Sequence, residues 1–507
     1  MRVIPDSEGV VREVKRRTRK NIAFALLACI AATPLAETMM EFDPVMGGGP
    51  PFRRLFLDAM VTEESAGLEK VFHAARKYEG NPIFKGEAAW EGWGPNLGGT
   101  VIRHDGGFRM YYYCISDDEP TNVCMAESKN GIHWTRPNLG LVEWKGSKKN
   151  NIIECSTMVG RLAYSDTLER AWITFSNKRL GYSPDGLHWT WDQSKGELFN
   201  SSDVINWFFD PYRNRMCATW KCSNRRHRAC GVVWSKDLVK WEKPYNGPVF
   251  VADDLDPDPT QIYGMPVFAY QGMYIGMPLI YHARWLKYGK YTSPNVMFEA
   301  QEGSPKNGDI QLAWSWDLIN WTRTAKREPF IPNGQDRAFD CGFIGTAREP
   351  LVMGDELWFY YSGWDQVHVN KGNPWDIKNP KAAVGLATIR LDGFCSMSAG
   401  KKEGWLISRR EVFNTPKVTI NARCAPGGYI AAELVDRNNN VIGGFEKNRC
   451  IPFTGDSVRG ELAWKTKEFP KEFIDKDKKV KFYLENADLY SYLPCDINQQ
   501  IDDGRPD

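Results

Sequence analysis

The stretch Ser128-Lys-Asn-Gly-Ile-His-Trp134 recurs three more times along the chain, and this repeat decides the fold. Every copy has a Ser, an Asp or Asn two residues later, an aliphatic residue four later and a Trp six later. The Asp or Asn side chain can hydrogen-bond the backbone two residues on, and Gly supplies a positive φ, so each copy predicts a hairpin turn. The Trp can cover that turn as an apolar plug. The other copies are Ser183-Pro-Asp-Gly-Leu-His-Trp189, Ser235-Lys-Asp-Leu-Val-Lys-Trp241 and Ser315-Trp-Asp-Leu-Ile-Asn-Trp321.

Strand-like runs rich in aromatic and β-branched residues precede these turns. A fifth run precedes a degenerate turn, and 384–393 occupies the place of its next strand. Repeated antiparallel units of four short strands predict an all-β fold with a five-bladed β-propeller over residues 81–398. The period is too long and too variable for WD40 repeats. The five runs are 108–113, 170–175, 215–220, 273–277 and 357–361.

Composition agrees with a folded, aromatic-rich protein. The 507 residues include 20 Trp, 20 Tyr and 25 Phe, and charged residues are 25%, which excludes a disordered or collagen-like chain. Four of the Trp close the repeated turns, so the aromatic excess is largely architectural. Without residues 1–36 the chain holds 58 basic and 60 acidic residues, which gives no sign of nucleic-acid binding.

The two ends differ from the repeats. A basic stretch, an apolar run over 22–32 and small residues up to Ala36 predict a signal peptide over 1–36 and a secreted or periplasmic protein. The run is too short for a membrane span, although Cys29 could carry a lipid anchor, and a buried amphipathic helix is the alternative. We expect a monomer or weak oligomer. The other predicted parts are an N-terminal extension packing on the propeller (37–80), a β-sandwich accessory domain that binds sugar or only braces the propeller (399–495), and a disordered tail (496–507).

The spacing of the cysteines does not match a known disulfide framework. No pair of Cys-x-x-Cys or Cys/His motifs has zinc spacing among the 12 cysteines, and most are expected to be small core residues. Cys114 and Cys124 flank a turn and could pair across a hairpin.

Together the repeats, the signal and the sandwich resemble the five-bladed propeller glycosidases of glycoside hydrolase families 43, 32 and 68. The likeness is closest to uncharacterised secreted bacterial relatives of that superfamily, covers about residues 53–492 and implies a glycosidase that cleaves a poly- or oligosaccharide with acids in a central funnel. The repeated turn also resembles the Asp boxes of sialidases. The shared stretches are Leu55-Phe-Leu-Asp58, Arg109-Met-Tyr-Tyr112, Pro137-Asn-Leu-Gly-Leu141, Tyr263-Gly-Met-Pro266 and Gly455-Asp-Ser-Val458.

The resemblance implies catalytic acids near the starts of the inner strands, and this chain departs from that pattern twice. Gly98 stands where the first-blade Asp is expected, and Tyr263 stands where the fourth-blade Glu is expected. We predict that Asp203→Asn and Asp340→Asn each abolish activity and leave the fold intact. The candidate catalytic acids, in order of preference, are Asp203, Asp340, Glu349 and Glu91.

Other side chains are expected to contact the sugar. No cofactor is expected, and no spacing predicts a metal site, although a structural metal ion in the funnel would suit a His. The two departures favour one alternative, a non-catalytic carbohydrate-binding propeller. The other alternative, a sialidase- or lyase-like enzyme on acidic sugars, needs arginines in the funnel, for which Arg284, Arg337 and Arg348 are the candidates. The expected substrate-binding residues are Trp93, Asn96, Tyr263, His282, Arg284, Arg348, Trp364, Asp365 and His368.

Overall fold

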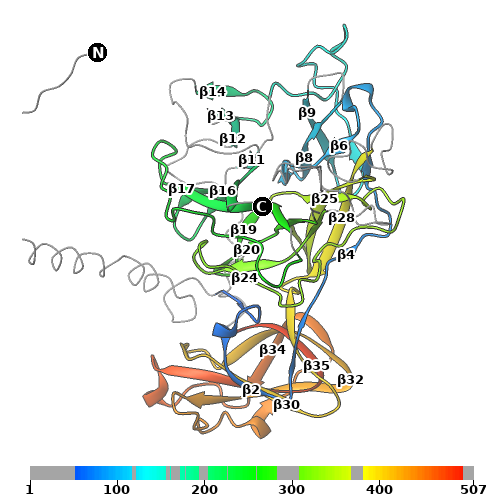
Figure 1. The fold of residues 1–507 in the computed structure, drawn as a ribbon. Coiled ribbons are helices and arrows are strands. Elements are labelled where there is room, and N and C mark those ends of the chain that lie inside the picture. The colour runs from blue at the N-terminus through cyan, green and yellow to red at the C-terminus, as the bar shows by residue number, and fades with distance from the viewer. Residues whose placement is uncertain are drawn as a thin grey trace, which may run out of the picture.

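The described residues of the computed structural model form strands and four short 3-10 helices. They divide into an upper body, residues 76–390, and a lower body that joins residues 54–72 to 395–493 (Figure 1). Of residues 160–161, 172–176, 179–180 and 192 the backbone alone is described. The structure describes residues 52–116, 121–155, 160–161, 172–176, 179–192, 204–224, 227–257, 260–282, 308–366 and 381–494.

Three antiparallel units follow one another through the first part of the upper body. In the first unit, β6 (Pro95–Asn96) and β7 (Val101–His104) both pair with β8 (Gly107–Cys114), which pairs with β9 (Asn122–Ser128) and then β10 (Trp134–Thr135). The second unit is β11 (Gly160–Arg161), β12 (Trp172–Ser176), β13 (Arg179–Ser183) and β14 (Thr190–Asp192). The third is β15 (Ile205–Asp210), β16 (Arg215–Asn224) and β17 (His227–Ser235).

Two further units complete the upper body. The fourth unit is a four-stranded sheet of β19 (Val267–Tyr270), β20 (Met273–Gly276), β23 (Ala313–Ser315) and β24 (Thr322–Arg323). The inner parts of the same chain segments, β18 (Gln261–Gly264), β21 (Leu279–Tyr281) and β22 (Gly308–Ile310), belong to a nine-stranded sheet that continues into the fifth unit through a parallel pairing of β22. The fifth runs β25 (Phe343–Thr346) and β26 (Leu351–Met353), β27 (Glu356–Trp364) and β28 (Ala382–Arg390). Its last strand comes from the N-terminal segment, as β4 (Arg76–Lys77) and β5 (Phe84–Lys85).

All four repeats form the predicted turn. In the first copy the Asn130 side chain accepts from the backbone N–H of Ile132 at 3.0 Å and of His133 at 2.9 Å, and the Ser128 hydroxyl accepts from Gly131 N–H at 2.8 Å. The indole of Trp134 closes the turn by donating to the Gly131 carbonyl at 3.1 Å. Asp185, Asp237 and Asp317 accept the matching pairs of bonds in the other copies.

Apolar cores join neighbouring units, and one of them joins the first unit to the fifth. The indole of Trp134 lies edge-on to Tyr360 of β27 with ring centroids 6.0 Å apart, and the Tyr360 hydroxyl donates to the Gly131 carbonyl at 2.9 Å. Met110, Leu351 and Val384 belong to the same buried cluster. The chain of units therefore returns to its own beginning.

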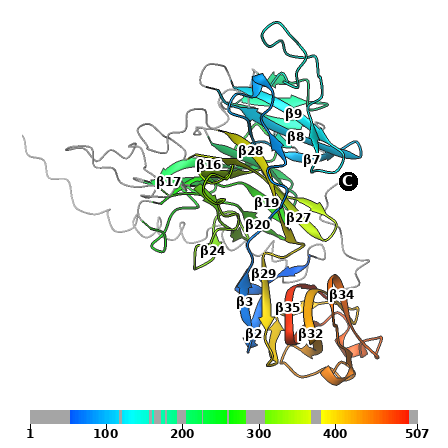
Figure 2. The ribbon, with the colours of Figure 1, turned by 90° about the vertical axis from the view of Figure 1, so that its right-hand side faces the viewer.

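The lower body is one curled ten-stranded sheet (Figure 2). Its path is β2 (Thr62–Ala66), β30 (Gly404–Ser408), β35 (Asp477–Leu493), β32 (Lys417–Asp436), β34 (Asp456–Trp464) and β33 (Cys450–Ile451). The pairing of β32 with β35 changes register between Asn421 and Ala422 and between Cys424 and Tyr429, and such irregularities bend paired strands. β1 (Arg54–Leu55), β3 (Glu69–Phe72), β29 (Cys395–Ala399) and β31 (Glu411–Val412) pair alongside.

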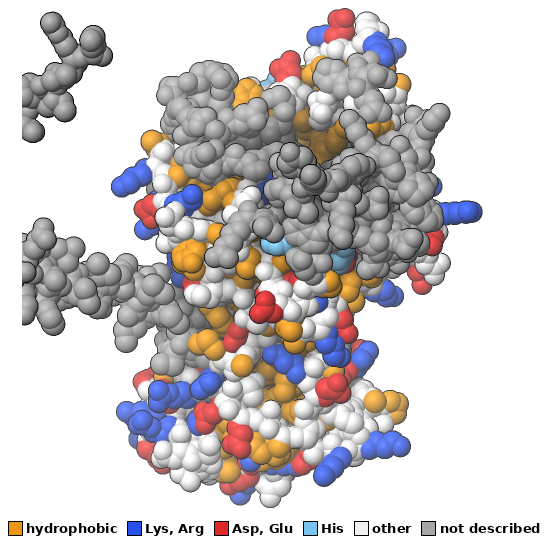
Figure 3. All heavy atoms as spheres, in the orientation of Figure 1, with side chains coloured by type: hydrophobic (Ala, Val, Ile, Leu, Met, Phe, Trp, Pro, Cys, Tyr) orange, Lys and Arg blue, Asp and Glu red, His pale blue; other side chains and the backbone are white. Residues whose placement is uncertain are grey.

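The N-terminal segment thus contributes to both bodies. Residues 54–72 supply strands to the lower body, whereas 76–85 complete the fifth unit, a division that the sequence did not predict. On the face drawn in Figure 3, acidic and basic side chains are interspersed over the lower body.

A buried ionic joint fastens the bodies together. Asp392 accepts from Arg53 Nε, the Tyr270 hydroxyl and the Ser491 hydroxyl, each at 2.6 Å. Burial alone would raise the pKa of Asp392, but these partners, Arg53 first, hold the pKa below its usual value. A carboxylate so stabilised keeps its charge in the interior.

Some sequence predictions concern residues outside the described part of the chain, namely the signal peptide over 1–36, Cys29 and the tail over 496–507. Within the part described, no helix is long and apolar enough to cross a membrane. Cys114 and Cys124 are free, buried thiols: in the ladder Cys114 lies opposite Asn122, and Cys124 lies opposite Tyr112.

Candidate functional site

Several predicted site residues lie at one edge of the upper body. At this edge the strands β6, β18 and β25 begin, and the strands β21 and β27 end. Trp93 precedes β6 and Asn96 is its second residue, Tyr263 lies in β18, and Trp364 ends β27. We call this edge the mouth. His282, after β21, Asp365, after β27, and Asp340, before β25, lie at the same edge. Asp203, Arg284 and His368 fall outside the described residues.

Glu349 and Arg348 lie at the opposite end of β25. The backbone N–H of Gly342, near Asp340, bonds the Trp364 carbonyl, whereas that of Ala347 bonds the Tyr360 carbonyl. Four residues of β27 separate these two points, about 13 Å at 3.3 Å per residue. Catalytic carboxyl groups of glycosidases lie roughly 5–9.5 Å apart. The backbone near Asp340 and the backbone near Glu349 are therefore farther apart than this range, which argues against a shared bond between sugar units.

Aromatic side chains form a continuous band along the mouth. Trp93 and Trp364 meet edge to face with centroids 5.8 Å apart, and Trp364 lies opposite Phe343 across the β25–β27 ladder. Phe343 contacts Tyr263 at 5.6 Å and Tyr281 at 6.3 Å, and these two tyrosines lie 5.9 Å apart. Tyr281 and Phe343 are buried, so the partly exposed members of the band, Trp93, Tyr263 and Trp364, are the ones that could pack against a sugar ring.

Two basic side chains of the third unit reach the same band. Lys221 Nζ, in β16, lies 4.6 Å from the centroid of Tyr263. The guanidinium carbon of Arg228, in β17, lies 5.5 Å from the centroids of both Tyr263 and Tyr281. Cations over aromatic faces are stabilised by the ring quadrupole. Both cations therefore lie against the tyrosine end of the band.

A histidine–aspartate pair borders the band. His282 Nε2 lies 2.5 Å from Asp309 Oδ2, with 36% of the histidine side chain exposed against 9% of the aspartate. Burial lowers the pKa of His282, but the hydrogen bond and charge of Asp309 outweigh it, so the pKa lies above its usual value. Asp309 Oδ1 is buried without a partner among the described residues. His282 is thus a group that can carry a proton at the mouth.

Asp365 is a half-buried carboxyl next to Trp364. Its Oδ1 accepts from the backbone N–H of Lys381 at 2.9 Å, and burial raises its pKa despite that bond. A carboxyl group with a raised pKa suits a general acid. Gly308 and Trp364 both pair with Phe343, from opposite sides of β25, so the Cα atoms of Asp309 and Asp365 lie on the order of 12 Å apart.

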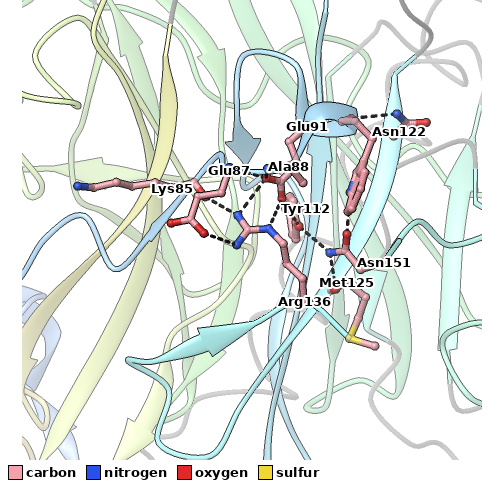
Figure 4. Close-up of polar contacts among 10 residues, drawn as sticks. Lys85, Glu87, Ala88, Glu91, Tyr112, Asn122, Met125, Arg136 and Asn151 are labelled. Carbon is pink, nitrogen blue, oxygen red and sulfur yellow. Dashed lines mark hydrogen bonds and ion pairs between the residues drawn. The ribbon is translucent and has the colours of Figure 1, made fainter. Parts of the chain in front are cut away.

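Glu91 is enclosed by the first unit (Figure 4). Its side chain accepts from Arg136 Nε at 2.8 Å and Nη2 at 3.0 Å, from the Tyr112 hydroxyl at 2.7 Å, and from the backbone N–H groups of Glu87 at 2.9 Å and Ala88 at 3.0 Å. The residue is 0% exposed. The carboxylate has no open side for substrate, so its role in this structure is to hold the first unit together.

Asp340 is also committed to an internal network. Its Oδ2 accepts from Lys77 Nζ at 2.5 Å and from the Tyr361 hydroxyl at 2.9 Å, and the residue is 2% exposed. The Tyr361 hydroxyl also accepts from Asn81 Nδ2 at 3.2 Å. Asp340 therefore ties the N-terminal segment to β27. Asn96, the remaining candidate, is buried and accepts from the Ser362 hydroxyl at 3.1 Å.

Comparisons with known proteins find likeness in structure alone. No protein-family model matches the chain, and no curated protein sequence matches it significantly. A solved glycoside hydrolase matches at 14% identity and a TM-score of 0.37 over 65% of this chain and 92% of that chain. An N-acetylgalactosamine deacetylase from F. plautii matches at 13% and 0.38 over 65% and 97%.

A third solved structure, a putative glycoside hydrolase from Parabacteroides distasonis, matches at 13% identity and a TM-score of 0.40 over 64% of this chain and 97% of that chain. TM-scores below 0.5 leave the assignment of function to this chain's own residues.

Sequence reasoning missed Lys221, Arg228 and Asp309 as members of this site. Lys221 had a local signal, because it is the first charged residue after the run 216–220 in a strand of alternating faces. Arg228 and Asp309 had none, since strands far apart in the chain bring them to the mouth. Among the described residues, no group of three or more His, Cys, Asp or Glu side chains is placed to hold a metal ion.

Proposed function

We propose that the chain is a secreted glycoside hydrolase whose upper body is a five-bladed β-propeller and whose lower body is an accessory β-sandwich. The succession of antiparallel strand groups along the chain supports this architecture, in which β22 and β25 join the fourth and fifth units in one sheet. So does the core shared by the first and fifth units, because a ring of blades must close on itself. In that ring the N-terminal β4 and β5 complete the last blade.

The observation that carries the proposed activity is the combination of groups at the mouth. An aromatic band suited to a sugar ring runs directly into Asp365, a half-buried carboxyl with a raised pKa. Glycosidases need one protonated carboxyl group for the leaving oxygen and a second group that attacks or activates water. Asp365 fits the first role.

The second role has two candidates. Asp203 comes two residues before β15, at the start of the third inner strand, and we retain it as the proposed carboxylate. His282, charged or neutral according to its contact with Asp309, is the other group at the mouth that can take up a proton. Glu91 and Asp340 are left out of the proposed catalytic set because other protein groups occupy their carboxylates.

A second candidate function is action on acidic sugars. Lys221 and Arg228 favour it, since both bring positive charge to Tyr263 at the mouth. A carboxylate or sulfate group on the sugar would be attracted to that end of the band. Both candidate functions use the same propeller and the same aromatic band, and they differ only in the charge of the substrate.

The test is product release, read by mass, from a panel of neutral and acidic oligosaccharides. We expect the wild type to release sugar and Asp365→Asn to lose at least about 100-fold in rate, which is the range of a lost general acid. Asp105→Asn is the matched control, because Asp105 is exposed in the β7–β8 turn and makes its side-chain contact with His104.

The outcomes separate the candidate functions. Release from neutral sugars supports the first proposal, and release confined to acidic sugars supports the second. Binding of the panel without any release overturns both and leaves a carbohydrate-binding propeller. Equal rates for Asp365→Asn and the wild type overturn the role of Asp365.

A further inference from the structure

Arg348 is a buried cation that makes no ion pair with any carboxylate in the described part of the chain, and the charge nearest to it in sequence is that of Glu349. The residue is 6% exposed, and no carboxylate of the described residues lies within 4.0 Å of its guanidinium. Nη1 donates to the Trp207 carbonyl at 3.3 Å, whereas Nε is buried with no hydrogen-bond partner in the described part of the chain. Leaving a charged donor unpaired in the interior is costly, so such a group needs a counter-charge.

The position of Arg348 is interior to the ring of units. It follows β25 of the fifth unit, yet its bond reaches β15 of the third unit. β15 is an edge strand of its sheet, so carbonyls on its outer side have no ladder partner there. The guanidinium therefore crosses the space between the inner strands of two units that are not neighbours in the chain.

A second buried donor lies close by. Thr346, two residues before Arg348, has a buried hydroxyl with no hydrogen-bond partner among the described residues.

We infer that Arg348 and Thr346 bind a small inorganic anion, of the size and charge of chloride, inside the upper body. An anion would supply the counter-charge for the guanidinium and accept from both Nε–H and the hydroxyl. Burial lowers the pKa of Arg348 to about 10, although the charge of the adjacent Glu349 opposes this shift, which agrees with an incompletely compensated guanidinium. The site is separate from the mouth, since it lies beyond the other end of β25.

The first test is thermal unfolding of the full chain in chloride, bromide or nitrate, against gluconate at the same ionic strength. A ligand that binds only the folded state raises Tm with the logarithm of its concentration. We expect a rise on the order of 1–3 °C for each tenfold increase in chloride above its dissociation constant. Gluconate, too large for such a site, should give no rise.

The matched variants are Arg348→Met and Arg215→Met. Arg215 is also buried, but Asp210 already compensates it at 2.8 Å. We expect both variants to lower Tm, and Arg348→Met alone to remove the dependence on small anions. A chloride dependence that is unchanged in Arg348→Met would overturn the assignment.

If Arg348→Met does not fold, crystals of the wild type grown with bromide can show directly whether an anion binds beside Arg348. Anomalous density for bromide beside Arg348 Nε is the expected result. Density for water alone at that place, together with equal Tm in chloride and gluconate, would show that solvent satisfies the guanidinium and would overturn the inference.

Discussion

Replacing Glu91 with Gln tests whether its carboxylate serves the fold or the chemistry. Gln keeps the shape and can still accept from the two backbone N–H groups, but it removes the negative charge that faces Arg136. The amide NH₂ of Gln would also face guanidinium donors. The Arg136 side chain would be left with Glu87 at 3.5 Å and the Lys85 carbonyl.

The magnitude follows from burial. Glu91 and Arg136 are 1% and 17% exposed, and breaking a buried pair by removing one partner costs about 3–5 kcal/mol. At about 2 °C per kcal/mol for a body of this size, Tm of the upper body should fall by roughly 6–10 °C. Calorimetry of both proteins measures this shift.

The control is Glu127→Gln in the same unit. Glu127 pairs with Arg109 at 3.2 Å, but it is 44% exposed, so its loss should cost less than about 1 kcal/mol. Product release at a temperature where both variants are folded should equal that of the wild type. An unchanged Tm together with lost product release in Glu91→Gln would refute the structural role and make Glu91 catalytic.

Three other predictions follow from single contacts. Asp392→Asn should lower the free energy of unfolding by about 3–5 kcal/mol, because it removes the buried carboxylate that pairs with Arg53. The folded pKa of Asp392 is depressed, so the wild-type advantage in denaturant unfolding should be present above about pH 4 and should shrink as pH falls through the folded pKa. Leu318→Gly should lower the free energy of unfolding by about 2 kcal/mol. Leu318 has φ 70°, so glycine relieves about 1 kcal/mol of backbone strain, but the side chain is 0% exposed and its loss costs about 3 kcal/mol; a more stable variant would contradict this. Asp309→Asn should lower the pKa of His282 in an NMR titration, since Asp309 raises it. The variant should also lose the stability that this pair contributes below about pH 6.5 in the wild type, a contribution that fades as pH rises through the folded pKa. An unmoved pKa would exclude the coupling.

The repeated turn was predictable because its interactions are local. Asp317 bonds the backbone two and three residues on, so the motif specifies its own geometry. Even so, positive φ was expected from Gly, and in two copies a Leu adopts it. Leu238 and Leu318 are both buried, so burial of the side chain compensates the strained backbone there.

The candidate site was less predictable because its members come from separate units. Glu91 looked like a displaced catalytic acid in its local sequence, yet its partner Arg136 lies 45 residues away and decides its role. Asp340 is similarly fixed by Lys77, 263 residues earlier in the chain. Long-range pairs of this kind leave no periodic pattern in the sequence. Long-range strand pairing also explains why the N-terminal strands belong to two different bodies, which the sequence did not predict.

The central claim, that the mouth hydrolyses glycosidic bonds, is tested most directly by reaction in oxygen-18 water. The wild type should release a sugar whose new reducing end carries the heavy oxygen, and Asp365→Asn at the same folded concentration should release almost none. Release of unlabelled product, or equal labelled product from Asp365→Asn, would contradict the account.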